Sequence, residues 1–526
     1  MTSNRVSYSV AVAAAATTLI SLTFVALRRP KTKDTHNDES LRPYPPTPPN
    51  RHWLWGHALC LRPDPNAPKQ SHDLLFLEWN KKLKSKVVMF QIPMLGRFIV
   101  VSDATVARYV LMGNFRKSPT YKTLLPLIGR KSMVATEGET WASQRRLYNP
   151  GFNPAFLRGC VKTILEKCNR FVTRCDDDIE NGLATNMLSR AVDLTSDVLA
   201  QLAFGEDWGV CNERNDGLET LQTIRELTVA VGENMSNPLL RYFGFKQRWK
   251  TWRLSRALER SMQRLVRRRL ESMGDSLRDR PDERDILSLT LSSVLKSNHL
   301  TNPQNVSFSS DDLENMTSQL KTFYFAGHDT TATTIAWAFW LLVQHPLVLQ
   351  RARQEVVTHI GKEWEIQARE GNELSETTYD ALHKCEYLDA IARETLRLYP
   401  PAASTRFVTD SQASAGGYRL GNAIVHINFY AIQRDPGVWE DADSFIPERF
   451  LGEEGKRMIA SSSFLPFSKG MRDCIGKYFA LLETKIALAV LISRYDANIV
   501  DDVEIYASRL TSIPMGGCKV ELRHRM

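Results

Sequence analysis

The stretch Phe467-Ser-Lys-Gly-Met-Arg-Asp-Cys-Ile-Gly476 places one cysteine in a glycine-containing loop near the C-terminus. A thiolate that binds iron needs donors aimed at its sulfur and a cation that holds an anionic cofactor. Cys474 supplies the sulfur, Phe467 can shield it, and Arg472 offers a planar fork to a carboxylate. Gly470 and Gly476 remove side chains where the backbone turns sharply and approaches a flat ligand. A lone cysteine is usually a small buried hydrophobe, but this spacing favours a metal-thiolate loop.

The residues after the loop, Ala480–Val490, have helical spacing, so the positive N-terminal end of a helix would face the thiolate. The pattern Phe-x-x-Gly-x-Arg-x-Cys-x-Gly resembles the haem-binding signature of the cytochrome P450 monooxygenases. Four further motifs, in the family's order, extend the resemblance from about residue 43 to the C-terminus. The resemblance implies a haem b cofactor with Cys474 as the axial ligand of its iron. Ser468 stands where many members have glycine, which we interpret as tolerated variation.

A long segment with apolar residues at helical spacing runs from Ser309 to Gln344. Serine and aspartates at its start provide an N-cap and first-turn charge, and Pro346 closes the far end. The sequence therefore predicts a single helix long enough to cross a domain. Its middle carries the polar motif Ala326-Gly-His-Asp-Thr-Thr331.

The residues of this motif suit a site over a flat cofactor. Gly327 would let a flat ligand approach, and the hydroxyl of Thr330 can compete for backbone hydrogen bonds and distort the turn. The alternative interpretation is a polar notch on an otherwise buried helix. The family resemblance assigns Asp329 and Thr330 to oxygen activation and proton delivery. We interpret His328 as a lining or surface residue and not as a metal ligand.

A clamp for an anionic cofactor is the next expectation. Trp141-Ala-Ser-Gln-Arg145 presents an indole N–H and a guanidinium on one face of a helix. An ordinary amphipathic helix with a surface arginine would show the same sequence pattern. Arg406 follows the proline-containing segment after Tyr399. The resemblance implies that Trp141, Arg145, Arg406 and Arg472 meet the carboxylates of the haem.

The pair Glu394-Thr-Leu-Arg397 lies on a predicted helix over Asp380–Tyr399, where two residues three apart share a face. An isolated pair of this kind is usually solvated and contributes only a few tenths of a kcal/mol. By resemblance, Arg449 is the third member of a cluster with Glu394 and Arg397. The resemblance implies a structural role for this cluster and not a catalytic one.

Length and composition fit this assignment, since 526 residues with 43% hydrophobic content can bury a large core. The segments 86–92 and 97–102 resemble two short strands joined by a turn, whereas most later segments have helical spacing. We therefore expect a mainly α fold (α+β), with a large helical domain and a small β-rich region. The resemblance implies the cytochrome P450 fold.

The N-terminal residues predict a membrane anchor. Val6–Leu27 carries no charge and is long enough to span a bilayer as a helix. The cations that follow it predict a cytoplasmic C-terminal domain, and a cleaved signal peptide is the weaker alternative. We expect a short lumenal N-terminus over residues 1–5, an anchor over 6–27, a basic and proline-rich linker over 28–50, and a haem-thiolate monooxygenase domain over 51–526. The resemblance implies the endoplasmic reticulum.

The net charge of +9 does not by itself indicate nucleic acid binding. Arg253–Arg269 contains many arginines, but Leu254, Leu258, Met262 and Leu265 recur at helical spacing, which favours a solvated amphipathic helix. We expect no nucleic acid partner. The eight cysteines include no Cys-x-x-Cys spacing, and we expect those other than Cys474 to be free thiols.

The expected activity follows from the combined motifs. A thiolate ligand favours O–O bond cleavage, so the resemblance implies a monooxygenase that inserts one atom of O2 into an apolar organic substrate. Because few residues follow Cys474, electrons would come from NADPH through a separate cytochrome P450 reductase, with cytochrome b5 as a further partner. Membrane lipid is the other expected partner. The whole sequence looks similar to filamentous-fungal monooxygenases of secondary metabolism, such as those that oxidise aromatic polyketides.

The substrate pocket is assigned by resemblance alone. The candidate residues are Ala403, Ser404, Thr405 and Ile513, with segments around 117–130 and 205–242 as a cap. Two other functions are considered: an oxygen-independent haem-thiolate isomerase or dehydratase, and a non-catalytic haem-binding sensor. The presence of Asp329 and Thr330 argues against the first, and a complete relay would be superfluous in the second.

Overall fold

The chain divides into two units, residues 1–43 and residues 44–526, and the second contains the elements described below. The predicted anchor over 6–27 and most of the predicted linker lie outside the described residues. The computed structural model describes residues 42–52, 55–61, 71–93, 95–212, 215–236, 244–273, 285–297, 308–370, 379–500, 503, 505–508 and 510–525.

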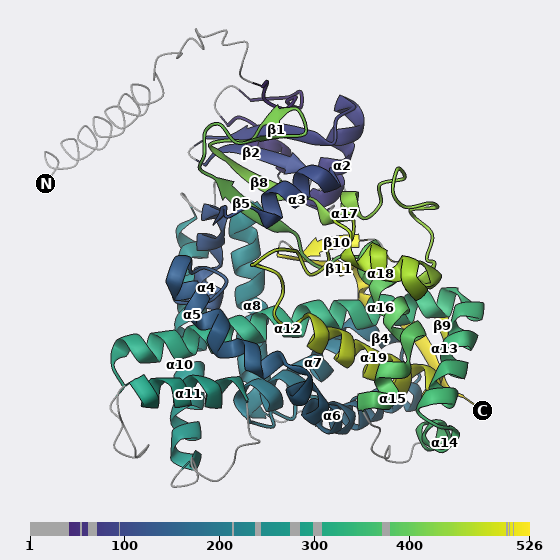
Figure 1. The fold of residues 1–526 in the computed structure, drawn as a ribbon. Helices are drawn as coiled ribbons and strands as arrows, with labels where there is room; N and C mark the ends of the chain where they lie inside the picture. The colour runs from purple at the N-terminus through teal and green to yellow at the C-terminus, as the bar shows by residue number, and fades with distance from the viewer. Residues whose placement is uncertain are drawn as a thin grey trace, which may run out of the picture. The chain divides into compact units, whose positions relative to one another are not determined.

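Helix α12 (Ser310–Gln344) runs through the middle of the helical part (Figure 1). The Ser309 hydroxyl accepts a hydrogen bond from the Asp312 N–H at 3.1 Å, and two aspartates occupy the first turn. Pro346 begins the next helix, α13 (Pro346–His359). The predicted long helix is therefore confirmed, and its termini follow from capping chemistry.

Helices surround α12 on several sides (Figure 1). Among them are α7 (Met187–Phe204), α16 (Glu386–Leu398) and α19 (Lys477–Arg494). The other helices are α2 (His72–Leu83), α3 (Ala104–Met112), α4 (Leu125–Ile128), α5 (Gly138–Tyr148), α6 (Pro154–Glu180), α8 (Asn215–Ser236), α10 (Phe245–Met273), α11 (Ile286–Ser297), α14 (Lys362–Glu370), α15 (Tyr379–Lys384), α17 (Phe429–Ile432) and α18 (Gly452–Ala460).

The predicted helix over Asp380–Tyr399 is wrong in one respect. The chain forms two helices, α15 and α16, which are separated at Cys385, whose φ of −76° and ψ of 75° are not helical. The Glu355 carboxylate of α13 accepts hydrogen bonds from the N–H groups of Tyr387 and Leu388 at 2.6 and 2.8 Å. A tertiary contact thus caps the start of α16, which local spacing could not indicate.

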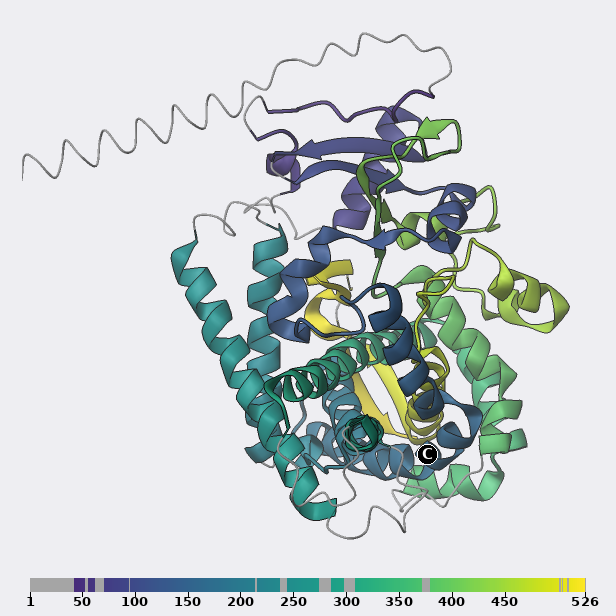
Figure 2. The same ribbon diagram turned by 60° about the vertical axis from the view of Figure 1, so that its left-hand side comes forward.

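A five-stranded sheet has the order β1-β2-β8-β5-β3. The two predicted strands are confirmed as β1 (Val87–Ile92) and β2 (Gly96–Val101), which pair antiparallel. β2 pairs in parallel with β8 (Ala423–Ile427), so N-terminal and C-terminal segments lie side by side (Figure 2). β8 pairs antiparallel with β5 (Ser404–Val408), and β5 pairs antiparallel with β3 (Arg116–Lys117). The register therefore sets Lys117 opposite Arg406.

Three small sheets complete the fold. A hairpin of β10 (Ile505–Ser508) and β11 (Thr511–Pro514) contacts α12. A three-stranded sheet has the order β4 (Thr185–Asn186), β12 (Lys519–His524) and β9 (Tyr495–Ile499). A two-stranded sheet pairs β6 (Ser414–Ala415) with β7 (Tyr418–Arg419). The mainly helical α+β expectation is confirmed.

Helix α10 confirms the amphipathic interpretation of the arginine-rich segment, because its four periodic apolar residues are buried: Leu254, Leu258, Met262 and Leu265. Within the described ranges, no helix by itself has the length and apolarity to cross a membrane. In these ranges, only α12 and α13 taken together are long and apolar enough, and a bend of 113° separates the two helices.

Candidate active site

The cysteine loop lies directly before α19. The Cys474 N–H donates a hydrogen bond to the Phe467 carbonyl at 2.9 Å, which closes the loop. The side chain is accessible, while desolvation by the surrounding protein raises the pKa of the Cys474 thiol and a hydrogen bond from the Gly476 backbone lowers it. Gly476 is the N-cap residue of α19, so the positive end of that helix meets the loop. The sulfur thus lies against the loop backbone and is exposed to a ligand.

The backbone of the loop turns twice through the left-handed region. Gly470 has φ of +78°, and a Cβ atom there would lie 2.4 Å from the Leu111 carbonyl oxygen, so only glycine fits. Ser468 has φ of +58°, and its buried hydroxyl has no hydrogen-bond partner. Gly476 has φ of −87°, and a Cβ atom there would meet Phe152 only at 3.7 Å. The expectation that a sharp turn requires glycine therefore holds for Gly470 and not for Gly476.

A cluster of cations, of which Arg406 is buried and Lys117 and Arg472 are half-buried, lies at the edge of the five-stranded sheet. Arg406 is almost fully buried, and its Nη1 donates to the Ser404 hydroxyl at 2.8 Å and to the Thr405 carbonyl at 3.1 Å. Its Nη2 is buried without a partner. The Arg472 guanidinium lies 4.2 Å from the centre of the Trp141 ring, and its Nη2 donates to a backbone carbonyl at 2.6 Å.

Lys117 and Tyr121 belong to the same cluster. Desolvation and the positive charges of Arg406 and Arg472 lower the pKa of Lys117 to about 8, against the opposing effect of Tyr121. Burial raises the pKa of Tyr121, but the charges of Lys117 and Arg406 and hydrogen bonds with Thr405 outweigh it and lower this pKa to about 8. Within the described ranges, the three cations Lys117, Arg406 and Arg472 form no ion pair with a carboxylate. An anionic ligand would relieve their mutual repulsion.

Arg145 contacts the cysteine loop. Its Nη2 forms an ion pair with the Asp473 carboxylate at 2.9 Å, and its Nη1 donates to the Asp473 carbonyl at 2.8 Å. Its Nε donates to the Asn149 side chain at 3.0 Å. Arg145 on α5 therefore fastens the residue beside Cys474, and its contact with a haem carboxylate stays a prediction.

The polar motif of α12 faces two directions. The Thr511 hydroxyl donates to Asp329 Oδ2 at 2.8 Å, and the Thr330 hydroxyl donates to the Ala326 carbonyl at 2.9 Å. His328 instead is buried, stacks on Tyr324 with ring centres 4.8 Å apart and hydrogen bonds to the Tyr324 carbonyl at 2.8 Å. The interpretation of His328 as a surface residue is wrong, because its side chain is buried, and the alternative that it lines the site stays a prediction.

Gly327 has a packing role that sequence reasoning did not foresee. A Cβ atom at this position would lie 2.8 Å from Leu199 Cδ1 on α7. A larger residue at Gly327 would therefore have to displace the end of the Leu199 side chain. The approach of a flat ligand to Gly327 stays a prediction.

The segments predicted to line the substrate pocket do meet. The Ser512 N–H of β11 donates to the Pro401 carbonyl at 2.9 Å, which joins the hairpin to the segment before β5. Ala403 and Ile513 are half-buried. Ser404 is buried and its hydroxyl accepts from Arg406, so it also supports the cation cluster, and its contact with a substrate stays a prediction. Thr405 hydrogen bonds with Tyr121 in the same cluster.

Comparison with known proteins decides the family. The family model described as Cytochrome P450 matches residues 45–515. This chain belongs to the cytochrome P450 family. The crystal structure of the cytochrome P450DA heme domain superposes with a TM-score of 0.75 at 22% identity, covering 92% of this chain and 99% of that chain, which shows the same fold.

Several relatives of this P450 are named as monooxygenases. Echinocystic acid 23-monooxygenase of Saponaria officinalis is 30% identical over 409 residues, which cover 75% of this chain and 73% of the relative. Cytochrome P450 4Z1 of Homo sapiens is 27% identical, covering 86% and 85%. Cytochrome P450 monooxygenase polC of Polytolypa hystricis is 27% identical, covering 73% and 68%. The protein is therefore an oxidoreductase of the P450 monooxygenase type.

The residues fit the haem that the P450 family implies. An accessible sulfur at Cys474 suits the iron, and the unpartnered Nη2 of Arg406 is a buried donor for a carboxylate. Lys117, Tyr121 and Arg472 add charge or hydrogen-bond donors beside it. Sequence reasoning missed Lys117 and Tyr121, because Lys117 becomes a neighbour of Arg406 only through the register of β3 on β5.

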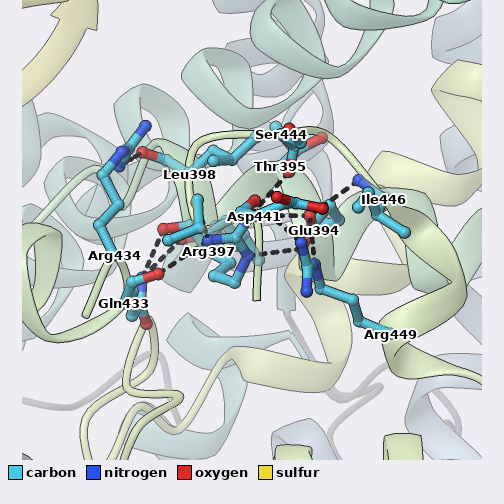
Figure 3. Close-up of polar contacts among 12 residues, drawn as sticks. Glu394, Thr395, Arg397, Leu398, Gln433, Arg434, Asp441, Ser444, Ile446 and Arg449 are labelled. Atoms are coloured by element: carbon cyan, nitrogen blue, oxygen red, sulfur yellow. Dashed lines mark hydrogen bonds and ion pairs between the residues drawn. The ribbon is translucent and has the colours of Figure 1, made fainter. Parts of the chain in front are cut away.

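The predicted structural triad of the P450 is brought together in the core (Figure 3). Arg397 binds Glu394 through two parallel hydrogen bonds of 2.7 and 2.8 Å, and both side chains are 0% exposed. The Arg449 Nε lies 3.3 Å from Glu394 Oε1. Arg397 also donates to three backbone carbonyls, those of Gln433, Ala442 and Ser444. The triad therefore joins α16 to the segment before α18.

Replacing Ser468 with glycine should stabilise the protein. A non-glycine residue at φ of +58° is strained, and the serine hydroxyl is buried without a partner. We expect Ser468→Gly to raise the free energy of unfolding by about 1 kcal/mol, measured by thermal unfolding of the haem-loaded protein. Ser463→Gly, in the same connecting segment but outside the left-handed region, should not stabilise it. A lower stability of Ser468→Gly would contradict the strain argument.

Proposed function

We propose that this P450 inserts one atom of O2 into an apolar organic substrate of a fungal secondary-metabolite pathway, such as an aromatic polyketide. The observation that carries the catalytic part is the set Cys474, Arg406 and Asp329, in which an accessible sulfur, a buried guanidinium with a free Nη2 donor and an oriented carboxylate occur together. Haem iron with a thiolate ligand supplies the oxygen activation. NADPH would supply electrons through a separate P450 reductase, with cytochrome b5 as a further partner.

The chain's own residues hold the cofactor and move protons. Arg406, Arg472, Lys117 and Tyr121 would bind the haem carboxylates, and Arg145 would keep the Cys474 loop in place through Asp473. The Thr511 hydroxyl contacts Oδ2 of Asp329, and among the described residues no hydrogen bond occupies Oδ1, which is the oxygen that would exchange protons. The Thr330 hydroxyl would deliver them near the reacting oxygen.

The substrate class is supported by the segments that we expect to line the pocket. Ala403 and Ile513 are apolar and half-buried, and β11 is tied to the segment before β5. These features suit a bulky apolar ligand. The fungal relative named a cytochrome P450 monooxygenase supports the fungal setting.

We infer that the protein is a single-pass protein of the endoplasmic reticulum membrane with a cytoplasmic catalytic domain. The uncharged segment 6–27 and the cations after it support this topology. Phe245, Trp249 and Trp252 share one face of α10 and are exposed, with Arg253 5.3 Å from the Trp249 ring. Such a mixture of aromatics and cations suits a lipid interface. Protease added outside sealed microsomes should digest the catalytic domain, and full protection would contradict this topology.

Replacing Thr330 tests the proposed proton delivery. We expect Thr330→Ala to bind haem normally but to lose product formation about 10-fold while releasing more hydrogen peroxide per NADPH. Peroxide, NADPH and product are measured together in a reconstituted system. Thr334→Ala is a matched control, because Thr334 lies one turn further along α12 and its hydroxyl also bonds a backbone carbonyl. Tight coupling in Thr330→Ala would contradict the proposal.

A further inference from the structure

The carboxylate of Asp329 is held by a residue far along the chain. Thr511 Oγ1 on β11 donates to Asp329 Oδ2 on α12 at 2.8 Å, across a separation of 182 residues. Thr511 is buried and Asp329 is half-buried. In the part of the chain that the structure describes, this is the one hydrogen bond to the Asp329 side chain, and no cation forms an ion pair with it.

The donor is fixed by its own surroundings. Thr511 pairs with Ser508 in the β10–β11 hairpin, and the next residue, Ser512, anchors the strand through its N–H bond to the Pro401 carbonyl. A hydroxyl on an anchored strand has few orientations, so it selects one rotamer of the carboxylate that it meets. Thr511 therefore has the geometry of an orienting group and not of a surface hydroxyl.

The same strand carries a predicted substrate contact. Ile513 lies two residues from Thr511, and residues two apart on a strand face the same side. One face of β11 thus presents both the donor to Asp329 and an apolar residue of the candidate pocket. The carboxylate is oriented by the element that would also contact the substrate.

We propose that Thr511 is a positioning residue that holds Asp329 in the orientation needed for proton delivery. The proposal rests on the proposed function, because it concerns the same reaction. Productive turnover consumes O2, NADPH, one proton and the substrate and yields a hydroxylated product, water and NADP+. When protons are delivered wrongly, O2, NADPH and one proton yield hydrogen peroxide and NADP+, and the substrate is left unchanged. Loss of positioning should therefore divert electrons from product to peroxide.

The test compares Thr511→Val, which keeps the shape and removes the donor, with Thr511→Ser, which keeps the donor. Ser512→Ala is the matched control, because it alters the adjacent side chain and keeps the backbone bond to Pro401. Product, peroxide and NADPH are measured with full-length protein and reductase, together with the solvent kinetic isotope effect. We expect Thr511→Val to lower kcat about 10-fold with KM within about twofold, and to raise peroxide per NADPH and the isotope effect. Thr511→Ser and Ser512→Ala should behave like the wild type.

The outcomes separate the two proposals. If Thr330→Ala and Asp329→Asn uncouple the reaction but Thr511→Val does not, the positioning role is wrong and the proposed function stands. If Thr511→Ser fails as badly as Thr511→Val and both unfold at lower temperature, the role of Thr511 is structural and the proposal is overturned. If neither Thr330→Ala nor Asp329→Asn changes coupling, proton delivery through this pair fails and the positioning role fails with it. If the wild type itself forms no NADPH-dependent oxygenated product, the proposed function fails.

Discussion

We expect Cys474→Ala to lose all NADPH-dependent and O2-dependent turnover and to lose the thiolate-type spectrum of the reduced carbon monoxide complex. The sulfur of Cys474 is accessible, hydrogen bonded by the Gly476 backbone and placed before the N-terminus of α19. Alanine removes the atom that would bind iron, and none of the remaining hydrogen bonds of the loop replaces it. A thiolate from Cys474 on haem iron would supply the electron density that favours O–O cleavage.

The matched control for this variant is Cys60→Ala. Cys60 is half-buried beside β1 and the N-terminal part of the sheet, and its thiol lies 3.8 Å from the Asn50 carbonyl. The control should keep both the spectrum and the activity. An unchanged carbon monoxide spectrum in Cys474→Ala would contradict the axial assignment. Loss of the spectrum in both variants would show that cysteine replacement damages the fold and not the iron site.

The second large effect is expected at the buried pair of Glu394 and Arg397. Arg397→Met should lower the free energy of unfolding by about 3–5 kcal/mol, because it leaves the Glu394 carboxylate buried and removes the donor from three backbone carbonyls. The measurement is thermal or chemical unfolding of the haem-loaded protein. The double variant Glu394→Gln with Arg397→Met should lose less than the sum of the two single variants, because their effects share one interaction.

Lys456→Ala is the control for that prediction. Lys456 forms an ion pair with Glu453 at 2.6 Å, but both side chains are exposed to solvent. The variant should leave the midpoint of unfolding unchanged. If Arg397→Met were as mild as this control, the triad would not be the structural element that its burial indicates.

Some of the fold is readable from the sequence because it is specified locally. α12 begins after a serine cap with aspartates in its first turn and ends before Pro346. The strands β1 and β2 have the expected turn between them, and Glu394 and Arg397 share a face through their spacing. Each of these features depends on neighbours within one element, so local chemistry was sufficient.

Other features depend on contacts between distant segments and left no local trace. The break of the predicted helix at Cys385 accompanies capping of α16 by Glu355, and Arg145 forms an ion pair with Asp473 in the distant cysteine loop. Lys117 joins the cation cluster only because β3 pairs with β5. In the same way, nothing in the sequence near Asp329 points to Thr511. The motifs thus predicted the residues of the candidate site better than they predicted the partners of those residues.

The most direct test of the account is an isotope experiment on the wild-type protein. Membranes that contain the P450, a reductase and NADPH are incubated with pathway extracts under ¹⁸O2, and new products are analysed by mass. We expect products that carry one ¹⁸O atom and require NADPH, and that are absent with Cys474→Ala. Products that form without NADPH and O2, or that take their oxygen from water, would contradict it.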